Sequence, residues 1–166
     1  MTPIHLYCKA NKRKRNDQAV GVYAYILQEG TECKEAIELL EEETRVAKLE
    51  LLALATGLKA LEDTKKLDEN QVVHLYVSNE YILEELQKGM QDQENGKALN
   101  FSKGTEYTEL WEEVEHLLGQ GVPYTANGLN KKERGEDDEM IKSNMGKLNK
   151  LACDEINRYF RGNAPQ

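Results

Sequence analysis

The chain has 166 residues, of which 39% are hydrophobic and 31% are charged. This length corresponds to one domain of ordinary size, and no apolar stretch approaches the roughly 18 residues that span a bilayer. The 22 basic and 30 acidic residues give a formal net charge of −8, which disfavours non-specific coating of nucleic acid. We therefore expect a single globular domain at 1–162 with a tail at 163–166, and no membrane association.

The cysteines and the N-terminus indicate a reducing compartment. Cys8, Cys33 and Cys153 lie far apart and form no CxxC pair, so neither a zinc knuckle nor a disulfide framework is indicated. The first residues lack the basic and apolar regions of a signal peptide. We expect a cytoplasmic protein.

The charge is unevenly distributed along the chain. Residues 1–18 carry five cations and one acid, a net charge of +4, which leaves −12 for the remainder. Four of these cations are consecutive: Lys12, Arg13, Lys14 and Arg15. We expect any phosphate-binding site to lie there, the alternative being an ordinary solvated turn between strands.

The first half of the chain predicts strands followed by a helix. Alternating strand formers at 4–8 and 19–27 predict an antiparallel hairpin, which the short polar stretch 11–17 would connect. Residues 35–40 predict a third strand, although their glutamate content also suits a helix. Residues 45–61 predict a largely buried helix, because few of their positions are polar.

The second half alternates between strands and helices, as in α/β domains. We expect a mobile charged loop at about 130–145, because its centre has no apolar anchors. The expected elements are a strand at 71–77, helices at 81–88 and 105–118 with a connection between them, a strand at 122–125 and a final helix at 149–160.

Glu50 is a carboxylate on an apolar helix face. Its helical neighbours include Val46, Ala53, Leu54 and Gly57. Burying an unpaired carboxylate costs several kcal/mol, so such a residue generally has a partner or a function. The alternative is a side chain at the margin of the face that reaches water.

The order of the predicted elements resembles the ribonuclease H family. That family has a TDGS-like turn after its first strand, an EL-containing buried helix, a TDSxYV strand end, a tryptophan-bearing helix and a CDELA-like final helix. The resemblance implies an α/β fold with a mixed five-stranded sheet, three antiparallel strands followed by parallel ones, flanked by helices. The corresponding stretches here are LYCKAN at 6–11, KLELLAL at 48–54, VSNEYI at 77–82, ELWE at 109–112 and CDEI at 153–156.

The same resemblance implies a degenerate catalytic centre. The family binds two magnesium ions with four carboxylates, to generate a hydroxide and to hold the leaving oxygen. Two of these are present as Glu50 and Asp154, whereas Lys9 and Ser78 occupy the other two positions. The family's flexible-loop histidine has no counterpart, because no histidine follows His116.

We expect this centre to have become structural, with Lys9 pairing with Glu50 near Asp154 and with no metal cofactor. One alternative is that substrate or a partner protein completes the site, and another is that Glu50, Asp154 and Asp17 bind one metal ion weakly. Magnesium would be the cofactor if the domain were active. The three histidines, His5, His74 and His116, are expected to be isolated packed or surface residues.

Three functions fit these observations. The leading interpretation is a pseudoenzyme that binds an RNA–DNA hybrid or double-stranded nucleic acid through Lys12–Arg15. The second is an active ribonuclease H that cuts RNA in RNA–DNA hybrids. The third is a protein-interaction scaffold, which the net charge of −8 also permits.

Overall fold

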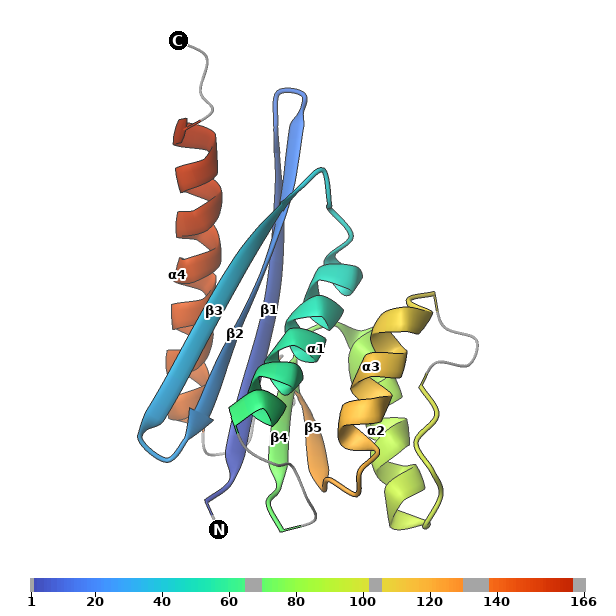
Figure 1. Cartoon of the computed structure of the whole chain (residues 1–166). Helices are drawn as coiled ribbons and strands as arrows, with labels where there is room; N and C mark the ends of the chain where they lie inside the picture. The colour runs from blue at the N-terminus through green and yellow to red at the C-terminus, as the bar shows by residue number, and fades with distance from the viewer. Residues whose placement is uncertain (1, 65–69, 102–105, 130–137, 163–166) are drawn as a thin grey trace.

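A computed structural model describes residues 2–64, 70–101, 106–129 and 138–162 (Figure 1). These residues form a mixed sheet with helices on both faces. None of the described helices is long and apolar enough to cross a membrane. The elements are β1 (Ile4–Arg15), β2 (Gln18–Glu29), β3 (Glu32–Glu41), α1 (Val46–Thr64), β4 (Val73–Val77), α2 (Glu80–Glu94), α3 (Thr108–Leu118), β5 (Tyr124–Gly128) and α4 (Asp138–Gly162).

The sheet has the order β3-β2-β1-β4-β5. Strands β1, β2 and β3 pair antiparallel, whereas β4 runs parallel to β1 and β5 runs parallel to β4. This arrangement confirms the expected mixed five-stranded sheet of a ribonuclease H-like α/β fold. The third predicted strand is also confirmed, because β3 pairs with β2 along its whole length.

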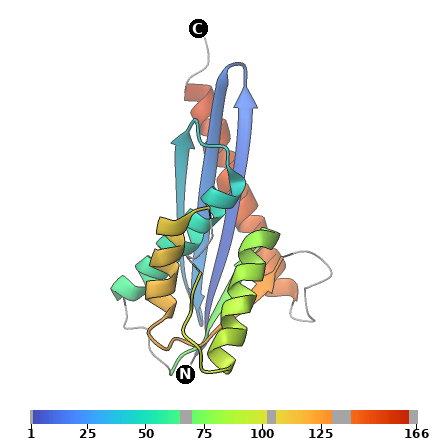
Figure 2. The ribbon, with the colours of Figure 1, turned by 90° about the vertical axis from the view of Figure 1, so that its right-hand side faces the viewer.

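Helices α1, α2 and α3 cover one face of the sheet, and α4 lies alone across the other (Figures 1 and 2). Side chains of β1 alternate between the two faces. Leu6 and Cys8 join the core beneath α1, whereas Tyr7 packs in the cluster under α4. Helix α1 approaches β1 closely at Gly57, where an added Cβ would lie 2.6 Å from Leu6 Cδ1.

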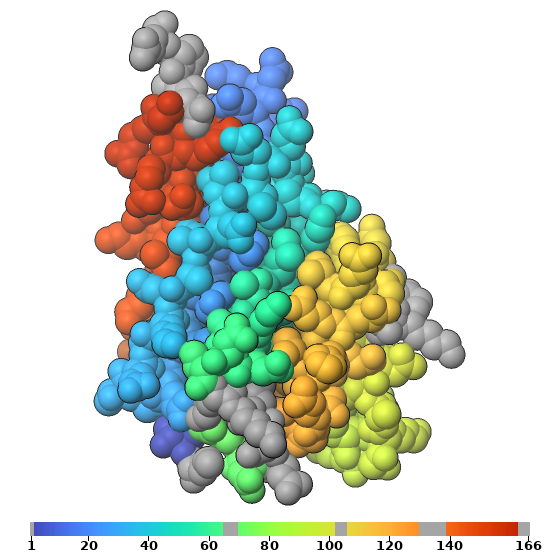
Figure 3. Space-filling view, viewed as in Figure 1, coloured from blue at the N-terminus to red at the C-terminus, as the bar shows by residue number. Residues whose placement is uncertain are grey.

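The β1–β2 hairpin is longer than the sequence predicted. Both strands continue to a two-residue turn at Asn16 and Asp17, so the basic residues lie within β1 rather than in a loop. Asn16 has a φ of +55°, a left-handed conformation that asparagine tolerates. The hairpin tip extends beyond the rest of the sheet, beside the C-terminal end of α4 (Figures 1 and 3).

Two helix boundaries differ from the prediction by six residues or more. Helix α2 continues to Glu94 rather than residue 88, and α4 begins at Asp138 rather than residue 149. The expected loop at about 130–145 is thus wrong for 138–145, while 130–137 lie outside the described residues. Ile141, Met145 and Leu148 recur at helical spacing on α4 and are buried against the sheet, so tertiary packing outweighs the polar local composition.

Candidate functional site

Glu50 lies at the corner where β4 ends and α2 begins. Its side chain is 1% exposed. One carboxylate oxygen, Oε1, accepts hydrogen bonds from the backbone N–H groups of Ser78 at 2.5 Å and Asn79 at 3.1 Å. The other, Oε2, accepts one from Ser78 Oγ at 3.1 Å. The buried carboxylate is therefore fully engaged with the chain itself.

These hydrogen bonds stabilise the N-terminus of α2. Asn79 is the N-cap residue, and its Oδ1 accepts from Ile82 N at 3.1 Å. Glu50 adds a negative group where unpaired helix N–H groups and the helix dipole favour one. Burial raises the pKa of Glu50, and the hydrogen bonds from Asn79 and Ser78 and the charge of Lys9 partly offset that rise.

Lys9 lies beside this corner but does not pair with Glu50. The parallel register sets Tyr7 opposite Tyr76, so two residues further along Lys9 is next to Ser78. Within the part of the chain that the structure describes, no ion pair joins Lys9 to Glu50. The expected pair is wrong because Lys9 shares the α4 face of β1 with Tyr7, whereas Glu50 lies on the α1 side.

Asp154 is not part of the Glu50 corner. It is exposed on α4, where it lines a shallow pocket with Glu35, Lys147 and Lys150. Glu35 belongs to β3, the edge strand two places away from β1. The α4 residue that contacts β1 near this level is Cys153, whose Sγ lies 3.9 Å from an Asn11 nitrogen. The structure thus places the two carboxylates on separate flanks.

The metal site that the sequence offers as an alternative would need the carboxylates of Glu50, Asp154 and Asp17 close together. Among the described residues, no group of three or more histidine, cysteine, aspartate or glutamate side chains has this arrangement. Asp17, the third residue of the alternative metal site, lies at the hairpin tip instead. The set of Glu50, Asp154 and Asp17 is therefore not assembled.

The four consecutive cations lie on both faces of the β1–β2 hairpin. Strand alternation directs Lys12 and Lys14 to one face and Arg13 and Arg15 to the other. A hollow of about 580 Å³ at the tip is lined by residues that include Lys12, Arg13 and Lys14. Arg13 donates from Nη1 to Asn157 Oδ1 of α4 at 2.5 Å, which links the hairpin to that helix.

Two other regions of the chain have the opposite charge. In sequence, residues 29–43 hold seven acids and one lysine, and residues 80–118 hold ten acids and three lysines. The first range includes the edge strand β3, and the second includes α2 and α3. The hairpin is therefore a localised positive region on an acidic body.

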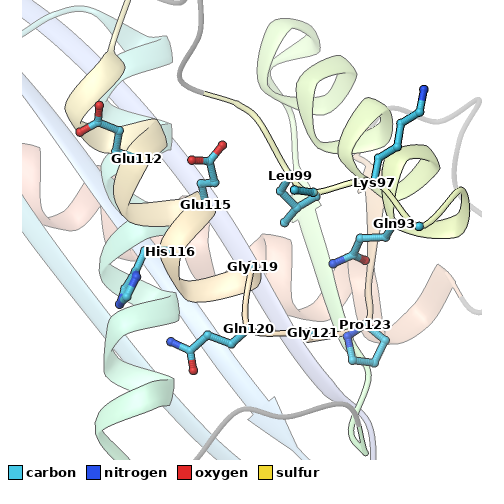
Figure 4. A pocket seen from close by; sticks show the side chains of 12 residues that line it. Gln93, Lys97, Leu99, Glu112, Glu115, His116, Gly119, Gln120, Gly121 and Pro123 are labelled. Atoms are coloured by element: carbon cyan, nitrogen blue, oxygen red, sulfur yellow. The ribbon is translucent and has the colours of Figure 1, made fainter.

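A second hollow, of about 770 Å³, lies between the C-terminal ends of α2 and α3 (Figure 4). Two of the polar side chains that line it already form hydrogen bonds within the chain. Gln93 donates to the carbonyl of Val122 at 3.1 Å, and Glu115 accepts from Phe101 N at 2.8 Å. None of the residues that the sequence singled out as catalytic or nucleic-acid-binding lines this hollow.

Two site features escaped the sequence analysis. The sequence does not identify Asn79 as a partner of Glu50, although its place directly before α2 is typical of an N-cap. It predicts isolated histidines at His5 and His74, whereas the parallel register sets them directly opposite each other. The two histidines meet only because β1 and β4 are neighbours in the sheet, which the spacing of residues along the sequence does not reveal.

No protein-family model matches the chain, and no curated protein matches it. Several solved structures are similar to it. The prototype foamy virus protease-reverse transcriptase superposes with a TM-score of 0.63 at 13% identity, covering 92% of this chain and 20% of that one. The foamy viral protease-reverse transcriptase in complex with dsDNA gives a TM-score of 0.60 at 12% identity, covering 92% of each chain.

A third similar structure is LC11-RNase H1, isolated from compost by a metagenomic approach, in complex with an RNA/DNA hybrid. Its TM-score is 0.56 at 15% identity, covering 87% of this chain and 97% of that one. The chain spans about a fifth of the length of the first protease-reverse transcriptase. At these identities the likeness concerns the fold, and the chain has a ribonuclease H-like fold.

Proposed function

We propose that this ribonuclease H-like domain is catalytically inactive and binds nucleic acid through its β1–β2 hairpin. The observation that carries the proposal is the placement of Lys12, Arg13, Lys14 and Arg15 on both faces of a hairpin that extends beyond the rest of the sheet (Figure 1). Cations in such a position can contact phosphates on either side without a change in the fold.

The Glu50 corner supports the absence of catalysis. Two-metal hydrolysis needs carboxylates free to bind ions. Within the described residues, the Glu50 carboxylate is engaged by hydrogen bonds from Ser78 and Asn79. Lys9 adds a positive charge next to this corner, where an ion would be repelled. Asp154 lies on the other flank of α4 and adds no ligand there.

The charge distribution supports a local binding site rather than general attraction to polyanions. The acidic β3 and α2–α3 regions repel phosphates, which favours approach of a nucleic acid to the hairpin and the adjoining part of α4. Two proteins with similar folds were solved with dsDNA and with an RNA/DNA hybrid. Both ligands are therefore suitable probes for this chain.

The proposal is tested by measuring binding of labelled RNA–DNA hybrid and of duplex DNA over a range of salt concentrations. A variant with Lys12, Arg13, Lys14 and Arg15 all changed to Gln should lose affinity. If all four contact phosphate, the slope of log K against log salt should fall by about 3–4, at roughly 0.9 per contact.

A matched control removes the same charge elsewhere, through Lys34→Gln, Lys59→Gln, Lys88→Gln and Lys97→Gln. These lysines lie outside the hairpin and are exposed. The control should keep the wild-type slope. Equal losses in both variants would show that net charge alone controls binding, and no salt-dependent binding by the wild type would favour a protein-interaction scaffold.

A further inference from the structure

A pair of histidines faces the α4 side of the sheet near the start of β1 and β4. The parallel register places His5 directly opposite His74, and both share this face with Tyr7 and Tyr76. The centroids of the two imidazole rings are 5.0 Å apart, and the ring planes differ by 24°. Both side chains are half-buried. The backbone positions of the two histidines are fixed by the parallel pairing of β1 with β4.

Each imidazole is oriented by a hydroxyl group. His5 Nδ1 lies 2.9 Å from Tyr76 Oη, and His74 Nδ1 lies 2.7 Å from Thr125 Oγ1. Within the described residues, the hydrogen bonds of both rings use Nδ1, so Nε2 of each has no such protein partner. When Nδ1–H donates to the hydroxyl oxygen, the lone pair of Nε2 is available to a ligand.

This arrangement has the features of a metal-binding histidine pair. A ligating histidine generally donates its other ring N–H to an oxygen that fixes its tautomer and orientation. Metal binding requires neutral imidazoles, and burial lowers the pKa of both, with the proximity of His74 lowering that of His5 further. Imidazole nitrogen suits Zn²⁺, Ni²⁺ and Cu²⁺, whereas Mg²⁺ prefers oxygen.

We propose that His5 and His74 bind one divalent transition-metal ion through their two Nε2 atoms. On an ion with bond lengths of about 2.0–2.1 Å, these nitrogens would lie roughly 3.3 Å apart. The stacked rings, with centroids 5.0 Å apart, would turn toward each other so that both Nε2 atoms face the ion. The remaining coordination positions are left to water or to an external ligand. This site is separate from the hairpin and from the Glu50 corner.

Isothermal titration of the untagged full chain with ZnCl₂, NiCl₂ and CuCl₂ tests the proposal, with MgCl₂ as the reference ion. One ion should bind per chain, with Cu²⁺ tighter than Ni²⁺ and Zn²⁺, and Mg²⁺ should give no comparable binding. His5→Phe and His74→Phe should each weaken binding at least tenfold. Thr125→Val should weaken it about tenfold, through the loss of an orienting oxygen.

The chain provides its own control, because its only other histidine is His116, which is exposed on α3. His116→Phe should leave binding unchanged. Imidazole ¹⁵N NMR of the wild type does not depend on any variant folding: Zn²⁺ should shift Nε2 of two histidines and leave the third unaffected. Absence of binding by the wild type, or an equal loss in His116→Phe, would overturn the proposal.

Discussion

The Glu50 corner and the basic hairpin occupy adjoining parts of the fold but use charge in opposite ways. At the corner, a carboxylate that is 1% exposed accepts three hydrogen bonds from Ser78 and Asn79. At the hairpin, Lys12, Lys14 and Arg15 are exposed, and the half-buried Arg13 donates a hydrogen bond to Asn157. A buried charge must be satisfied by the chain, whereas an exposed one remains free for a ligand.

This difference indicates where function can be sought in this ribonuclease H-like fold. Glu50 is part of the packing between α1, β4 and α2. The positions able to meet an external phosphate lie further along β1. Variants at the Glu50 corner should therefore change the stability of the fold, whereas variants at the hairpin should change nucleic-acid binding.

The largest effect on stability is expected from Glu50→Leu. The substitution leaves the buried N–H groups of Ser78 and Asn79 without their acceptor, and each such loss costs about 1–3 kcal/mol. We expect the free energy of unfolding to fall by about 2–4 kcal/mol, measured by urea denaturation. Lys9→Met is the control and should change it by less than about 1 kcal/mol, because Lys9 forms no ion pair with Glu50. A large loss for Lys9→Met with a small one for Glu50→Leu would contradict this assignment.

The next largest effect is expected from the double substitution Lys9→Asp and Ser78→Asp. It removes the hydroxyl donor to Glu50 and gathers like charges at the corner, so stability without metal should fall by about 2 kcal/mol. Magnesium should restore part of this loss, since an ion that binds only the folded state stabilises by about 2.7 kcal/mol at 100 times its Kd. The measurement is a thermal melt with and without MgCl₂. A variant that ignores magnesium would show that positions 9, 50 and 78 cannot form a metal site.

A smaller, pH-dependent effect is expected from Glu50→Gln, which keeps one oxygen acceptor. Because the pKa of Glu50 is raised, its contribution to stability is fully present below the ordinary value of 4.5 and declines as pH rises through the raised pKa. The amide has no such dependence. The loss caused by Glu50→Gln should thus be about 1 kcal/mol near pH 4.5 and smaller at pH 7. Denaturation curves at the two pH values measure this, and a loss that grows with pH would mean that the pKa is lowered instead.

The smallest effect on stability is expected at the hairpin. Changing Lys12, Arg13, Lys14 and Arg15 to Gln should alter the free energy of unfolding by no more than about 0.5 kcal/mol, because exposed charges contribute little. The loss of the Arg13–Asn157 bond is offset by relief of repulsion among adjacent cations. Urea denaturation beside the binding assay separates the two properties, and a strongly destabilised variant would make the hairpin a structural element.

Most of the fold could be predicted because its signals are local. Strand alternation, the apolar helix at 45–61 and the order of elements are read directly from the sequence, and Glu50 could be placed on an apolar face by helical spacing alone. The polar composition of 138–148 concealed the first half of α4. Its apolar residues are sparse, and their burial depends on the sheet beneath them.

The site was harder to predict because it depends on which way each side chain points from its strand or helix. Which face of β1 carries Lys9 follows from the phase of the strand in the sheet, and which flank carries Asp154 follows from the rotation of α4 about its axis. The CDEI stretch matched the family pattern in sequence, yet Asp154 lies beside Glu35 and Lys150. The partners of Glu50 were backbone groups, which a sequence comparison does not reveal.

The most direct test measures cleavage and binding of one RNA–DNA hybrid in the same samples during a magnesium titration. The wild type should bind the hybrid, release it as salt rises, and leave it intact at every magnesium concentration. Cleavage that EDTA and Glu50→Gln both abolish would contradict the central claim and identify an active ribonuclease H. Cleavage that survives Glu50→Gln would come from a contaminating nuclease. The assay would then be repeated on a repurified sample, for which we expect binding without cleavage.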